Sequence, residues 1–120
     1  MEITFYNKTG LPVVYLSVKD DNSIYTWDGN AVAYIEDELI YGWRGKHLGW
    51  YFNGILYDIF GYKVGTTIEK CVCPTAEEMS KEAKLPRYAR YLKYDIREKP
   101  KHKRSFSAEE LMDFITQNKI

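Results

Sequence analysis

A single pattern recurs four times in the first half of the chain and constrains its fold more than any other feature. An apolar residue and a tyrosine are followed, four positions after the tyrosine, by a glycine, two further residues and an aliphatic–small pair. The tyrosines are Tyr6, Tyr25, Tyr41 and Tyr57, and the glycines are Gly10, Gly29, Gly45 and Gly61. Intervals of 19, 16 and 16 residues are too short for helical repeats, which need about 30 residues or more.

The glycine of each unit lies where a β-hairpin turn requires positive φ. Asp28-Gly29 is a typical two-residue type I′ turn, and Asn53-Gly54 fits a second set of turns between units. Two strands of about six residues and two turns of about two residues account for the repeat. We therefore expect a mainly β, α+β protein with four antiparallel hairpins over residues 1–70, arranged as a pseudo-four-fold ring or a small barrel.

A two-residue turn also predicts which side chains share a face of each hairpin. On that register the three tryptophans lie on the same side as the aliphatic residues of the return strands. We expect one core made of Trp27, Trp43, Trp50, Val32, Leu48 and Val64.

Residues 71–120 form a second region, helical and basic, that packs on the repeats or trails from them. Thr75 and Glu78 form a capping box and predict a short helix to about Lys84. Ser107 and Glu110 form another and predict a closing helix, whose apolar side holds Leu111, Met112, Phe114 and Ile115.

The charge balance excludes a strongly basic or acidic protein, because 17 Lys and Arg face 17 Asp and Glu. The excess is uneven: residues 1–70 hold 6 basic and 9 acidic side chains, whereas residues 71–120 hold 11 and 8. No secretory signal or membrane-spanning stretch is found, so we expect a cytoplasmic protein without a membrane partner.

The two cysteines offer no convincing metal site. Cys71 and Cys73 are separated by one residue, whereas structural zinc sites draw on pairs two to four residues apart and need four ligands. We expect two reduced thiols, no metal and no cofactor.

The repeats could instead place rings and polar groups around a central pocket. Tyr25, Tyr41 and Tyr57 would line it, as aromatic cages do for cations or sugars, with His47 or Asp58 as the polar group. The alternative is that the same rings are ordinary core. No nucleophile–base arrangement surrounds His47, so no catalytic residue is assigned.

The basic region interleaves charge and rings at every third residue, as Arg87-Tyr88, Arg90-Tyr91 and Lys93-Tyr94. Such a pattern is typical of a surface that stacks single-stranded nucleic acid. The alternative is an arm whose tyrosines pack on the β region and whose basic side is solvated. The neutral total charge favours the arm, so nucleic acid is not expected as the main partner.

The repeat units resemble those of the 4-fold beta flower proteins, small bacterial proteins. The resemblance rests on the runs 45–50, 55–58 and 61–65 and covers about residues 1–68. It implies an architecture but no catalytic residue, because the family has no established activity.

We expect a non-catalytic binding or interaction module, with a protein or a second copy of the chain as partner. One alternative is a small-ligand-binding protein or an enzyme that uses the central aromatic pocket. A weaker alternative is nucleic-acid contact through residues 81–104. The candidate contact residues are Tyr25, Tyr41, Tyr57, His47, Asp58, Arg87, Arg90 and Lys93.

Overall fold

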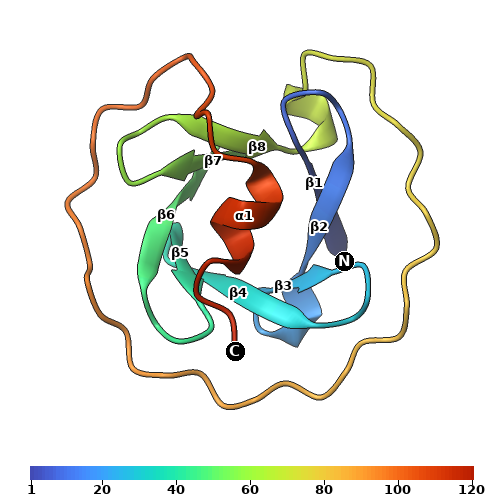
Figure 1. Ribbon diagram of the computed structural model, residues 1–120, viewed down its shortest axis with the longest axis vertical. Coiled ribbons are helices and arrows are strands. Elements are labelled where there is room, and N and C mark those ends of the chain that lie inside the picture. The colour runs from blue at the N-terminus through green and yellow to red at the C-terminus, as the bar shows by residue number, and fades with distance from the viewer.

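A computed structural model describes residues 1–120 and contains a closed barrel of eight antiparallel strands that follow one another in chain order (Figure 1). The expectation of a mainly β fold that closes as a small barrel is confirmed. The strands are β1 (Glu2–Tyr6), β2 (Pro12–Ser17), β3 (Ser23–Thr26), β4 (Ala31–Glu36), β5 (Leu39–Gly42), β6 (His47–Phe52), β7 (Ile55–Asp58) and β8 (Lys63–Thr66).

Helical structure is limited to two 3₁₀ turns, η1 (Val18–Asp20) and η2 (Ile68–Lys70), and one α-helix, α1 (Leu111–Thr116). The predicted closing helix is therefore present but short. The helix predicted from Thr75 to Lys84 is wrong, because this segment is extended throughout. Its backbone hydrogen bonds go to the barrel and not to itself.

The turn between β3 and β4 is one residue longer than predicted. The amide of Thr26 donates to the carbonyl of Asn30 (3.0 Å), which leaves three residues in the loop, with Gly29 last at φ +90°. The pairing register shifts after Ile24, as at a β-bulge. By contrast, Asn53 and Gly54 form the expected two-residue turn, with φ of +53° and +78°.

The bulges decide which residues fill the barrel, because they change the face that a side chain occupies. Ile24, Ile40 and Leu56, which directly precede the repeated tyrosines, lie in the core together with Val32, Leu48 and Val64. The tryptophans do not join this core as predicted, although two of them are buried. Trp43 (2% exposed) is buried in a separate cluster with Tyr34 and Tyr41, Trp50 (3% exposed) contacts the His47 ring, and Trp27 is half-buried.

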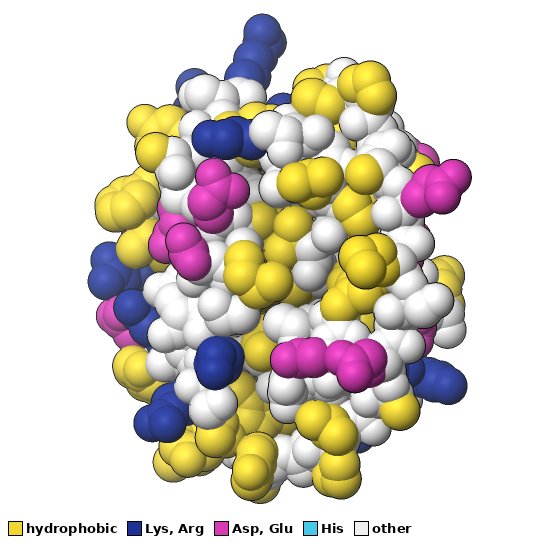
Figure 2. All heavy atoms as spheres, turned by 45° about the vertical axis from the view of Figure 1, so that its right-hand side comes forward, with side chains coloured by type: hydrophobic (Ala, Val, Ile, Leu, Met, Phe, Trp, Pro, Cys, Tyr) yellow, Lys and Arg dark blue, Asp and Glu magenta, His cyan; other side chains and the backbone are white.

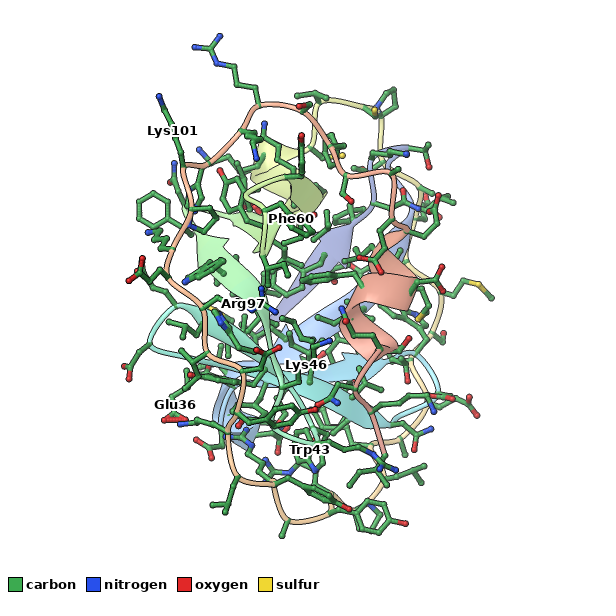
Figure 3. All side chains as sticks on the ribbon, turned by 60° about the vertical axis from the view of Figure 1, so that its left-hand side comes forward. Glu36, Trp43, Lys46, Phe60, Arg97 and Lys101 are labelled. Atoms are coloured by element: carbon green, nitrogen blue, oxygen red, sulfur yellow. The ribbon has the colours of Figure 1, made fainter.

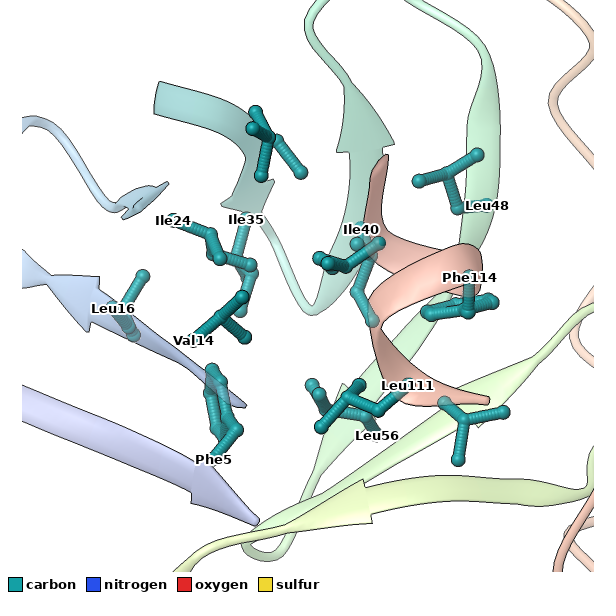
Figure 4. Close-up of a cluster of buried hydrophobic side chains, with 14 residues drawn as sticks. Phe5, Val14, Leu16, Ile24, Ile35, Ile40, Leu48, Leu56, Leu111 and Phe114 are labelled. Carbon is teal, nitrogen blue, oxygen red and sulfur yellow. The ribbon is translucent and has the colours of Figure 1, made fainter. Parts of the chain in front are cut away.

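Helix α1 closes the core. Leu111, Phe114 and Ile115 are each at most 1% exposed and point into the apolar cluster of the barrel (Figure 4). Met112, predicted on the same side, is 41% exposed and faces away from it. In Figure 1 the helix lies over the middle of the ring of strands, and the turned view in Figure 3 shows it toward one end of the barrel, where its apolar side chains complete the core.

Residues 71–106, which we call the strap, run around the outside of the barrel as an extended chain (Figure 1). The strap crosses the four turns that carry Gly10, Gly29, Gly45 and Gly61, which we call the glycine turns. Each of these glycine carbonyls accepts a 2.9 Å hydrogen bond from a strap amide, and the four donors are Ala76, Leu85, Tyr94 and Lys103. The strap is therefore bound at every ninth residue.

A side chain on the turn glycines would block this contact. A Cβ on Gly45, whose φ is +96°, would overlap the carbonyl oxygen of Leu92 in the strap, and one on Gly29 would overlap that of Ala83. The repeated glycines are thus required both for the turn conformation and for the close approach of a second backbone.

The C-terminal tail completes the third glycine turn. In the fourth, Asp58 Oδ1 accepts from the amides of Phe60 and Tyr62. The third has Gly42 at the corresponding place, and Asn118 Oδ1 accepts from Lys46 N instead (3.0 Å). The tail thus supplies the acceptor that this turn lacks.

We expect Phe114→Ala to reduce the free energy of unfolding by about 3–5 kcal/mol, because it opens a cavity at the centre of the core. Urea unfolding followed by tryptophan fluorescence measures the loss. Met112→Ala, on the exposed side of the same helix, serves as the control and should change stability by less than about 0.5 kcal/mol. A loss below about 1 kcal/mol for Phe114→Ala would contradict the placement of α1.

Candidate functional site

The interface between the barrel and the strap contains two similar clusters of aromatic rings. Tyr15 stacks on Tyr25 with ring centroids 5.6 Å apart, and Tyr34 stacks on Tyr41 at 5.3 Å. Each pair is met edge-on by a tryptophan, Trp27 in the first case and Trp43 in the second. The two sets form matching aromatic surfaces on the outer side of the barrel.

Cations of the strap cover these rings. The Lys81 ammonium lies 4.4 Å from the centroid of Tyr15, and the Arg90 guanidinium lies 3.9 Å from that of Tyr34. Three residues further along, Lys84 lies 5.6 Å from Tyr25 and Lys93 lies 5.2 Å from Tyr41. Cation–π contacts of this kind contribute about 0.5–2 kcal/mol each, more when the site is dry.

Carboxylates at the ends of the strands pair with the same cations. Lys84 lies 2.8 Å from Glu2 and 3.1 Å from Asp20. The hydrogen bond to Glu2 is the main reason that the pKa of Lys84 is raised. Lys93 lies 2.6 Å from Glu36. The cations are therefore held between rings and acids, and their charge is already balanced.

The interface changes where the strap meets β6 and β7. His102 occupies the strap position nine residues after Lys93, and its imidazole stacks on Tyr57 at 3.7 Å. Phe52 lies 5.9 Å from the imidazole, 16 residues after Glu36. The rings of Phe52 and His102 thus take the positions that the ion pair of Glu36 and Lys93 holds in the preceding repeat.

The structure brings three of the predicted contact residues, Tyr25, Tyr41 and Tyr57, to this interface and not to the core of the barrel. Tyr25, Tyr41 and Tyr57 are 1%, 5% and 6% exposed, and burial raises the pKa of each phenol. His47 and Asp58 are also buried, at 1% and 7% exposure.

His47 and Asp58 both line a cavity of about 180 Å³ beside α1. The Nε2–H of His47 donates to the Gly49 carbonyl (2.9 Å), and its Nδ1 accepts from the amide of Arg97 (3.0 Å). Burial lowers the pKa of this imidazole. Because both ring nitrogens are bonded and Asp58 holds its own turn, the two groups act as structural anchors.

The other three predicted contact residues face the barrel. Arg87 donates to the backbone carbonyl of Asp20 (2.6 Å) and to Ser23 Oγ (3.1 Å), whereas the adjacent Tyr88 is 70% exposed. Arg90 and Lys93 lie on the rings described above. The expected arm with inward tyrosines and solvated basic groups is therefore wrong, since the extended strap turns the basic side chains inward.

The cysteines lie at the start of the strap. The Cys73 thiol donates to the carbonyl of Lys8 (3.0 Å), and Cys71 is partly exposed. No group of three or more His, Cys, Asp or Glu side chains is close enough to hold a metal ion.

The strap also contains a nine-residue repeat that the sequence analysis missed. Lys81, Arg90 and Lys99 are spaced by nine residues, and so are Lys84, Lys93 and His102. The signal is present in the sequence, but it is a repeat of charge and not of hydrophobicity. The repeat can be interpreted only once the strap is known to cross the glycine turns.

The fold and this interface define a class of protein, a closed eight-stranded β-barrel whose outer side is encircled by the strap of the same chain. The family model of the 4-fold beta flower proteins matches residues 3–115. The chain belongs to this family, and the match includes the barrel, the strap and most of α1. Neither the curated proteins nor the solved structures contain a significant match. The chain has no helix with the length and apolar character needed to cross a membrane.

We expect the protein to lose stability as the pH falls below about 6.5, the unfolded pKa of histidine. Burial, and then the nearby Lys99 ammonium, lower the pKa of His102, while Glu38 opposes them in part. A histidine with a lowered folded pKa favours folding only while it is neutral.

Urea midpoints between about pH 7.5 and 5.5 measure this effect, above the range in which carboxylates protonate. His102→Phe retains a ring on Tyr57 and should show a smaller decline than the unmodified protein. Equal declines for both proteins would show that His102 contributes nothing.

Proposed function

We propose that the protein is a non-catalytic binding module whose barrel binds an extended basic peptide on its outer surface. In the structure, the strap of the same chain occupies this binding surface. The observation that carries the proposal is the regular contact at all four glycine turns, where the strap is bound through its backbone. Hydrogen bonds to the backbone of the bound segment do not depend on its side chains, so they tolerate many sequences. The positions of the cations over the rings add specificity.

The same contacts support four equivalent hairpin repeats with pseudo-four-fold symmetry. Each glycine turn accepts one strap amide, and the donors are nine residues apart. The barrel repeats every 16 residues and the strap every nine residues. With these two spacings, equivalent residues of barrel and strap would meet in each repeat around a ring. The first repeat is longer, with 19 residues between its tyrosine and the next.

A catalytic role for the predicted pocket has little support by comparison. Phe114 and other apolar side chains fill the centre of the barrel. Both ring nitrogens of His47 are hydrogen-bonded to backbone groups, and Asp58 Oδ1 accepts from two amides of its own turn. A general base needs a free nitrogen or oxygen within reach of a substrate proton.

The test uses full-length protein with a protease site inserted between Lys70 and Cys71, cleaved after folding. A fluorescent peptide of residues 71–106 is added in excess, and its anisotropy is measured with nicked and with intact protein. We expect binding to the nicked protein, where the strap can exchange, and none to the intact protein.

A matched peptide with Lys81, Lys84, Arg90 and Lys93 replaced by Gln should bind at least about tenfold more weakly, because it lacks the cations that cover the rings. Equal affinity of the two peptides would contradict the role of the cations. Unfolding of the nicked protein, judged by circular dichroism, would show that the barrel does not stay folded without the attached strap and so cannot bind a separate peptide.

A further inference from the structure

The last part of the strap differs in charge from the parts before it. Residues 97–104 contain five basic side chains and one acidic side chain, Glu98. In the earlier part, Lys81, Lys84, Arg90 and Lys93 each pair with a carboxylate of the barrel or of the strap. In the last part, only Arg97 does so, with Asp95 of the strap itself (3.3 Å).

The remaining cations of this part have no acidic partner. Lys99, Lys101, Lys103 and Arg104 are all exposed, and none of them forms an ion pair. The reason lies in the barrel, because Phe52 stands where Asp20 and Glu36 supply carboxylates to the earlier cations. The result is a local excess of positive charge on a protein of zero net charge.

Exposed rings accompany these cations. Phe60, in the β7–β8 turn, is 62% exposed, and Phe52 is 44% exposed. Lys103 Nζ donates to the carbonyl of Phe60 (2.5 Å), and Lys99 Nζ lies 4.7 Å from the Phe52 ring centroid. Phe60 and Lys101 lie at the same end of the molecule, and the Lys101 side chain extends away from the barrel (Figure 3).

The outer side of the strap continues this row of rings. Tyr88, Tyr91 and Tyr94 are 70%, 49% and 48% exposed, because the basic side chains between them turn inward. The face in Figure 2, turned toward the first glycine turns, instead mixes acidic and basic side chains among scattered hydrophobic ones. Within the strap, unpaired lysines and exposed rings of the barrel thus meet at residues 97–104, beside Phe52 and Phe60.

We propose that this surface, formed by residues 97–104 of the strap with Phe52 and Phe60, binds single-stranded nucleic acid. Exposed rings accept unstacked bases whatever their identity, and the adjacent cations neutralise the phosphates. A duplex hides its base faces and would leave both rings unused. The proposal does not depend on peptide exchange by the barrel, because the surface is the outer side of the strap in its bound state.

Fluorescence anisotropy with a labelled oligothymidylate of about 15 nucleotides tests the proposal at about 50 and 200 mM salt. Lys101→Gln/Arg104→Gln removes two cations whose side chains make no hydrogen bond or ion pair in the structure. Lys8→Gln/Lys19→Gln removes two equally exposed, unpaired cations elsewhere and leaves the protein with the same net charge.

We expect the unmodified protein and Lys8→Gln/Lys19→Gln to bind with the same affinity within about twofold. Lys101→Gln/Arg104→Gln should bind about tenfold more weakly, with a salt dependence shallower by about 1.4, or 0.7 per lost phosphate contact. Phe60→Ala should weaken binding severalfold without changing the salt dependence, because it removes a stacking ring and no charge.

Three outcomes would overturn the proposal. The first is no binding at low salt, and the second is an equal loss for the two double variants, which would make net charge the only determinant. The third is competition by polyglutamate as effective as competition by unlabelled oligothymidylate, which would assign the surface to an acidic protein segment.

Discussion

One backbone hydrogen bond, repeated four times, holds the outer layer of this protein on its barrel. The carbonyl of each turn glycine accepts from a strap amide, and the absence of a side chain on the glycine permits the approach. An extended chain without a strand partner would otherwise leave many backbone groups unsatisfied. The spacing of the glycine turns therefore determines where the strap contacts the barrel.

The side chains between these contacts explain why the aromatic content of the chain is high. A barrel of eight short strands is filled by aliphatic residues, Phe5 and three side chains of α1, which leaves the repeated tyrosines on the outside. The strap covers them with cations, and Arg90 lies 3.9 Å above Tyr34. Rings, cations and carboxylates form a second layer, in which the tyrosine rings are buried and the cations lie between rings and carboxylates.

The sequence predicts the barrel well and the outer layer poorly, for physical reasons. Tyrosine–glycine spacing indicates short strands, and Val32 and Leu48 are correctly assigned to the core. The tryptophans are misplaced because a three-residue loop and a bulge change the register by one residue, which reverses the face of every side chain beyond it. The capping box at Thr75 is overridden, since the strap amides find partners on the barrel. His47 and Asp58 do line the same cavity. Their hydrogen-bond partners could not be predicted from the sequence, because the conformations of the turns were not known.

Hydrogen exchange of the strap amides, measured by NMR on the native protein, tests the central claim most directly. We expect slow exchange at Ala76, Leu85, Tyr94 and Lys103, whose amides donate to the turn glycines, and fast exchange at exposed strap amides between them that have no acceptor. Protection with a nine-residue period would establish the docked strap. Uniformly fast exchange from residue 71 to residue 106 would contradict it.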